Sequence, residues 1–177
     1  GAEFFTDRDL TNEEKKSKKY LENIFEQPIN TFTPPQNLLS YKGIKALTNN
    51  QLSICGDLPK MLNYKTIKLV GINNFLKYVF FRLKNKTNIF PFPINNKNFS
   101  FITHFRMQPG TDLTLLYKKF DEVYKHNGNF VLSTHSYAFD YKMNNTGQTM
   151  QFELEKFINY CKTKDSVNFV SLNKMFN

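Results

Sequence analysis

Residues 130–140 read Phe130-Val-Leu-Ser-Thr-His-Ser-Tyr-Ala-Phe-Asp140. The first half is apolar and β-branched and ends in Ser-Thr-His, which predicts a buried strand with His135 at its C-terminal end. Open α/β folds and α/β barrels place their chemistry at that end of the strands. Because histidine moves protons near neutral pH, His135 is the candidate catalytic residue. The alternative is a histidine that only ends a strand, in the core or at the surface.

The rest of the chain alternates between predicted strands and predicted helices. Further strands are expected at residues 29–33, 52–55, 66–70, 99–105 and 167–172. Helices are expected at residues 12–26, 41–49, 72–84, 112–127 and 150–161. A capping box of Thr11 and Glu14 is expected to open the first helix. The alternation predicts one α/β domain of 177 residues, with mainly parallel strands in an open sheet or a barrel.

A second strand end also carries unusual residues. The strand expected at residues 29–33 runs into two prolines, which fix the backbone and offer no N–H, so the loop that follows is stiff. Such a loop can form the wall of a pocket, or it can simply end the strand. We expect a substrate pocket at the sheet edge that carries Thr33 and His135. The candidate substrate-binding residues are Pro34, Pro35, Asn37, Tyr137 and His104. For His104 the alternative is a structural wall residue.

The chain is basic, and its cations are mostly lysine. Its net charge is +9, from 21 Lys, 3 Arg and 15 acidic residues. Nucleic-acid recognition favours arginine for bidentate contacts with bases and phosphates, and no nucleic-acid-binding motif is present, so we do not expect a nucleic-acid partner. A lysine-rich surface is compatible with an anionic glycan, a membrane surface or no specific partner.

The two cysteines, Cys55 and Cys161, form no CxxC pair, which excludes a zinc knuckle. Cys161 falls on the apolar stripe of a predicted helix, so we expect a buried free thiol there. A chain that does not depend on disulfides suits the cytoplasm, which is slightly favoured on this ground alone. No apolar run approaches the length of about 18 residues that a membrane-spanning helix needs.

Four segments resemble, in order, parts of a polysaccharide deacetylase-like domain of the carbohydrate esterase family four type. They are Gly1-Ala-Glu-Phe4, Phe32-Thr-Pro-Pro-Gln-Asn37, Ile44-Lys-Ala-Leu47 and Val131-Leu-Ser-Thr-His-Ser-Tyr137. The last of them is similar to the late histidine motif of that family. The resemblance covers most of the chain and corresponds to the C-terminal portion of a divergent member.

The resemblance implies a distorted (β/α) barrel and a hydrolase that removes acyl groups from amino sugars. In that family an Asp and two His hold a divalent metal, often zinc, which polarises the acetamide carbonyl and activates water. An Asp acts as the base, and the late histidine, which His135 matches, protonates the leaving amine. The family's Asp-Asp and His-x-x-x-His motifs precede the segment with which this chain begins. No metal ligands are therefore identified in this chain.

Three functions follow from these observations. The first is the C-terminal part of a metal-dependent carbohydrate N-deacetylase, which acts on a cell-surface polysaccharide or its precursor. A missing N-terminal segment or a second chain would then complete the barrel. The second is a non-catalytic glycan-binding or scaffold domain on the same fold. The third is an unrelated basic α/β module that binds an anionic polymer.

Overall fold

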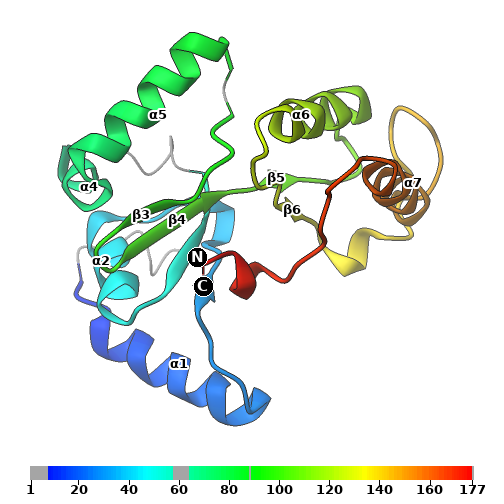
Figure 1. Cartoon of the computed structure of the whole chain (residues 1–177). Coiled ribbons are helices and arrows are strands. Elements are labelled where there is room, and N and C mark those ends of the chain that lie inside the picture. Colours follow the sequence, from blue (N-terminus) through cyan, green and yellow to red (C-terminus); the bar gives the residue numbers. More distant parts are fainter. Residues whose placement is uncertain (1–7, 58–63, 88, 177) are drawn as a thin grey trace. The chain divides into compact units, whose positions relative to one another are not determined.

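The computed structural model describes residues 8–57, 64–87 and 89–176 of the chain (Figure 1). The contacts between residues divide the chain into two compact units. Unit 1 contains the chain up to Thr103 together with the segment from Leu172, and unit 2 runs from His104 to Ser171. The Gly1-Ala-Glu-Phe4 segment of the resemblance lies outside the described residues. That the chain forms one domain stays a prediction.

Unit 1 is built on a four-stranded sheet with the order β1-β2-β4-β3. Its strands are β1 (Thr31–Phe32), β2 (Ser53–Gly56), β3 (Ile94–Asn96) and β4 (Phe99–Thr103). The pairs β1–β2 and β2–β4 are parallel, whereas β3 joins the edge of β4 antiparallel. In β4, Phe99 and Phe101 lie on one face with their rings stacked at 6.3 Å. The strand predicted at residues 99–105 is divided, because β4 ends at Thr103 and Phe105 begins a strand of the other sheet.

The helices of unit 1 precede or connect these strands. They are α1 (Thr11–Phe25), the 3-10 turn η2 (Pro35–Asn37), α2 (Tyr41–Asn49), α4 (Tyr64–Val70), α5 (Ile72–Asn85) and the 3-10 turn η4 (Leu172–Met175). Helix α2 has the predicted bounds, because Ser40 caps its start by accepting from Gly43 N at 3.0 Å. Its apolar side chains, Ile44 and Leu47, are 2% and 0% exposed and enter the core over the sheet.

The predicted capping box at the start of α1 is wrong. The N-cap is Leu10, whose side chain cannot accept a hydrogen bond. The carboxylate of Asp9 instead accepts from the backbone N–H of Thr11 at 3.0 Å and from its hydroxyl at 2.6 Å. These hydrogen bonds lower the pKa of Asp9, since they favour its charged form.

Unit 2 contains a two-stranded parallel sheet and two longer helices. Its elements are β5 (Phe105–Arg106), α6 (Leu113–Lys125), β6 (Leu132–Ser133), the 3-10 turn η3 (Ser136–Ala138) and α7 (Met150–Lys162). Asp112 caps α6 by accepting from Leu115 N at 3.2 Å, and Thr149 caps α7 by accepting from Phe152 N at 3.2 Å. The buried core of the unit comprises Met107, Leu113, Leu116, Phe120, Ala138, Met143, Met150, Phe157 and Cys161.

The fold is therefore mixed α/β with mainly parallel strand pairing, as the alternation predicts. A closed barrel is not formed by the described residues, since their strands hydrogen-bond into two separate sheets of four and two strands. Two predicted strands are also wrong. Residues 66–70 belong to α4, and residues 167–171 are irregular before η4 begins. Among the described residues, no helix is both long and apolar enough to cross a membrane.

Candidate functional site

The carboxyl ends of β5 and β6 lie side by side because the two strands are parallel. Arg106 pairs with Ser133 at the end of β5. The register is held by Phe105 N, which donates to Val131 O at 2.7 Å, and by Met107 N, which donates to Ser133 O at 2.9 Å. His135 follows β6 by two residues and opens the turn η3. The sheet thus brings Arg106 and His135 to the same edge.

Three exposed side chains form what we call the edge surface: Arg106, His135 and Tyr137. The rings of His135 and Tyr137 stack with centroids 5.0 Å apart and an angle of 17° between their planes. The guanidinium Nη2 of Arg106 lies 3.5 Å from Nε2 of His135. Tyr137 is 68% exposed, so most of its ring is open to solvent. The edge surface is an aromatic platform beside a cation.

The neighbours of the His135 ring are Arg106 and Tyr137. A guanidinium can only donate hydrogen bonds, and at 3.5 Å its contact with Nε2 of His135 lies at the distance limit of a hydrogen bond, so it does not fix the tautomer of the ring. Among the described residues, no hydrogen bond links the His135 ring to a carboxylate that would orient it as in a catalytic dyad. A carboxylate partner for His135 would have to come from outside the described residues.

The other predicted site residues divide between the two units. His104 is half-buried between β4 and β5, at the start of unit 2. Pro34 is buried, Pro35 is exposed and Asn37 has a φ of 58° in the turn η2, all in unit 1. β1 and β6 belong to different hydrogen-bonded sheets. One pocket shared by these residues and His135 stays a prediction.

Arg106 was missed by sequence reasoning, although a signal existed. It is one of only three arginines, and it directly follows the strand predicted at residues 99–105. In an α/β fold the residue after a strand is a candidate for the functional edge, which is the argument that selected His135. What the sequence did not show is that these two strands are neighbours.

The described residues do not supply a site for the metal that the resemblance implies. They contain no group of three or more His, Cys, Asp and Glu side chains placed to hold an ion. The cysteines do not supply a nucleophile either, because burial raises the pKa of Cys55 and of Cys161 to about 11, so both are neutral thiols near neutral pH.

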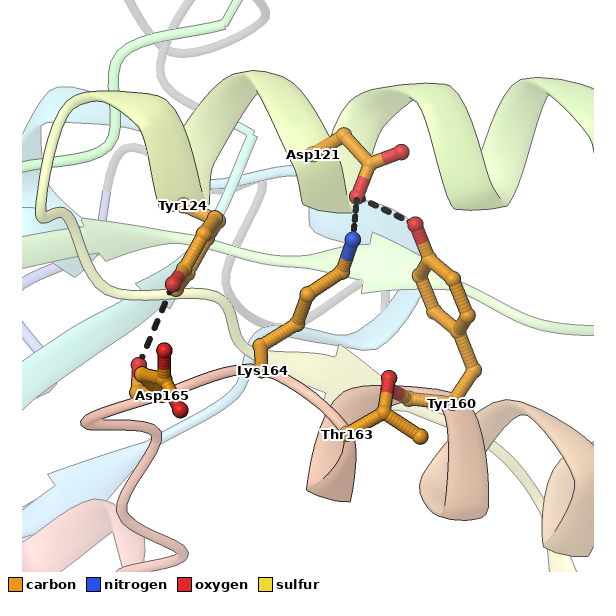
Figure 2. Close-up of polar contacts among 6 residues, drawn as sticks. All are labelled: Asp121, Tyr124, Tyr160, Thr163, Lys164 and Asp165. Atoms are coloured by element: carbon orange, nitrogen blue, oxygen red, sulfur yellow. Dashed lines mark hydrogen bonds and ion pairs between the residues drawn. The ribbon is translucent and has the colours of Figure 1, made fainter.

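A polar cluster lies between α6 and the end of α7 (Figure 2). It contains residue types that occur in active sites, but its contacts connect the two helices. Asp121 accepts from the hydroxyl of Tyr160 at 2.6 Å and lies 3.7 Å from the ammonium of Lys164. That ammonium also lies 4.6 Å from the centre of the Tyr160 ring. A hydrogen bond with Tyr160 raises the pKa of Lys164, so the side chain stays a cation and not a nucleophilic amine. These contacts stabilise the packing of the C-terminal end of α7 against α6.

Replacing Asp121 with asparagine is expected to lower the free energy of unfolding by about 1 kcal/mol, because a charge-assisted hydrogen bond and a half-exposed ion pair are lost. The measurement is the urea midpoint of the variant. Glu122→Gln is the matched control, since it removes a neighbouring carboxylate from the same helix and should change stability by less than about 0.5 kcal/mol. Equal urea midpoints for the two variants would show that the cluster does not stabilise the packing of α7 against α6.

Comparisons with known proteins leave the family of this chain open. No family model, no curated protein and no solved structure matches it. The chemical character of the edge surface is therefore the basis for a functional conclusion.

Proposed function

We propose that this chain is a carbohydrate-binding domain and that the edge surface of unit 2 is its binding site. The observation that carries the proposal is the exposed ring of Tyr137, held by its stack on His135 beside the guanidinium of Arg106. A large aromatic ring that is two-thirds exposed, yet fixed by a neighbour, is a feature of recognition surfaces and not of a core.

The platform suits a sugar ring. The C–H groups of a pyranose form an apolar face that can lie against the π face of tyrosine, while its hydroxyls remain free for hydrogen bonds and water. Because His135 already covers one side of Tyr137, little conformational freedom is lost when a ligand occupies the other side.

Arg106 supplies the polar part of the site. Its guanidinium offers donors in a planar fork, which pairs well with a carboxylate or with an amide carbonyl. The ligand class that fits both parts is a polysaccharide of amino sugars, whose N-acetyl carbonyls or carboxylates would accept from Arg106. The resemblance to polysaccharide deacetylases supports the same class of ligand.

The resemblance also supports a finer proposal for the fold, namely a partial barrel derived from the polysaccharide deacetylase type. The second candidate function is metal-dependent N-deacetylation of a cell-surface polysaccharide or its precursor. It is favoured by the exposed imidazole of His135 just beyond the carboxyl end of a parallel strand. It requires metal ligands from outside the described residues.

The test is calorimetric titration of the chain with soluble N-acetylglucosamine oligosaccharides. Tyr137→Ala should weaken binding by about tenfold, since a stacked aromatic contact of roughly 1.4 kcal/mol is lost. Arg106→Ala should also weaken binding, and Arg106→Lys should restore little, because an ammonium lacks the planar fork. Tyr20→Ala is the control, since Tyr20 is 66% exposed on α1 of unit 1.

Two results would overturn the proposal. One is the absence of binding to both acetylated and deacetylated oligosaccharides. The other is an equal effect of Tyr137→Ala and Tyr20→Ala. Release of acetate from the oligosaccharide, lost in His135→Ala, would replace it with the second candidate function.

A further inference from the structure

Helix α5 carries an apolar stripe that unit 1 does not bury. Its members are Ile72, Leu76, Phe80 and Leu83, which are 62%, 44%, 66% and 71% exposed. Their spacing of four, four and three residues places them on one side of the helix. At 1.5 Å per residue the stripe is roughly 16 Å long. Four large apolar side chains in one row are more than the scattered surface apolar residues of an ordinary domain.

The opposite side of α5 is firmly held. Tyr78 is 5% exposed and belongs to the core of unit 1, with Phe75 and Val79 packed against the same cluster. Asn74 Nδ2 donates to Asn95 O of β3 at 2.9 Å. The helix therefore cannot roll its stripe into the core, and Figure 1 shows it at the rim of unit 1.

The glycine before α5 fixes its direction. Gly71 has a φ of 83°, and a Cβ at that position would lie 3.0 Å from Nδ2 of Asn96. Asn96 in turn donates to Leu69 O of α4 at 2.6 Å. This turn joins α4 to α5 and packs both helices against β3, so the start of the stripe is attached to the sheet of unit 1.

The segment that carries the stripe is basic, although the carboxylate of Asp57 acts on the hydroxyl of Tyr78 on the buried side of α5. Residues 58–111 contain nine Lys and Arg and no Asp or Glu, which accounts for the whole net charge of +9. Five exposed lysines belong to α4, to α5 and to the C-cap of α5: Lys65, Lys68, Lys77, Lys84 and Lys86. Within the helix, Lys77 and Lys84 lie next to the stripe. An apolar row beside cations, with no carboxylate on either helix, has the composition of a helix that lies in the surface of an anionic membrane.

The type of cation beside the stripe favours a lipid surface over a protein as the partner of this face. Protein–protein interfaces are enriched in arginine and depleted in lysine. Here the exposed cations are lysines, while the one arginine, Arg82, is half-buried and has its guanidinium on the hydroxyl of Tyr78. Lysines near an anionic bilayer each add a favourable interaction with the headgroups, and their long stems can extend past the apolar stripe.

We infer that unit 1 binds the surface of anionic membranes through the α4–α5 face, with Ile72, Leu76, Phe80 and Leu83 inserted among the lipid headgroups and the lysines paired with acidic lipids. The helix lies in the plane of the membrane. This membrane contact is independent of the carbohydrate site, which is in unit 2.

The test is co-sedimentation of the whole chain with vesicles of phosphatidylcholine alone and of phosphatidylcholine mixed with phosphatidylserine. The wild-type chain should sediment with the anionic vesicles, bind the neutral ones at least tenfold more weakly, and lose binding as salt is added. F80S/L83S should weaken binding at least tenfold through the lost apolar contact. K77E/K84E should do the same through charge reversal.

The matched control is I24S/F25S on α1, where Ile24 and Phe25 are 54% and 61% exposed. It removes an equal pair of exposed apolar residues from the same unit and should leave vesicle binding unchanged. The chain has no tryptophan, so F80W and I24W provide single reporters. Only the emission of F80W should shift to shorter wavelength with anionic vesicles.

Three results would overturn the inference. They are no sedimentation of the wild-type chain with anionic vesicles, equal losses in F80S/L83S and in the control, and equal binding to both kinds of vesicle. Failure to bind vesicles, together with self-association that F80S/L83S abolishes in sedimentation velocity, would assign the face to a contact between copies of the chain instead.

Discussion

Replacing Phe120 with alanine is expected to lower the free energy of unfolding by about 3–5 kcal/mol, the usual cost of removing a large aromatic ring from a core. Phe120 is 5% exposed on α6. Its ring contacts four other rings, with centroids 5.5–6.2 Å away, and these belong to Tyr124, Phe130, Phe157 and Tyr160. Since domains are stable by only about 5–15 kcal/mol, the loss is a large fraction of the total.

The substitution should also weaken the carbohydrate binding that we propose for the edge surface. Phe130 packs on Phe120 and leads directly into β6, so a cavity at Phe120 loosens the strand that positions His135. Urea denaturation followed by circular dichroism gives the stability. Leu115→Ala is the control, because Leu115 lies on the same helix and is 45% exposed. A loss no larger than that of Leu115→Ala would show that the aromatic cluster does not stabilise unit 2.

Phe101→Ala is expected to have an effect of the same size, about 3–5 kcal/mol, in unit 1. Phe101 is 2% exposed in β4, where it pairs with Ile54 of β2 and Ile94 of β3. Phe101 thus lies in the core of unit 1, where the surrounding side chains are held by the sheet and can fill a cavity only in part. Ser100→Ala is the control, because Ser100 is half-buried on the other face of the same strand.

Hydrogen exchange measured by mass spectrometry would locate the two effects. Phe101→Ala should accelerate exchange first in peptides of β2, β3 and β4, and Phe120→Ala first in peptides of α6, β6 and α7. Faster exchange over the whole chain in both variants, with no local difference, would contradict a division of the core into two clusters.

The sequence alone determined most of the helices. Where an apolar stripe with a period of 3.6 residues coincided with a capping side chain, the predicted bounds agree closely with the structure, as in α2 and α7. Both signals are local, because a stripe and a cap depend only on residues within one or two turns. The burial of Cys161 was predictable for the same reason.

Only the tertiary structure decided which extended segments became strands. Residues 66–70 have a strand-like composition, but they form part of the helix α4. Thr66 and Val70 are about one helical turn apart, so the helix buries both side chains. Residues 94–96 lie in a segment rich in Asn and Pro, a composition typical of loops, yet they form β3 on the edge of β4. A strand needs a partner, and the partner is distant in sequence.

The candidate site divides in the same way. The position of His135 after a strand could be predicted from residues 130–140, because a strand pattern and its end are local features. The prediction that this strand is buried is wrong, because both residues of β6 are half-buried. Arg106 joins it only because β5 pairs with β6 across 27 residues, from Phe105 to Leu132. The exposure of the stripe on α5 is also decided by the tertiary structure. Periodicity shows that a helix has an apolar row, but it does not show whether another element covers that row.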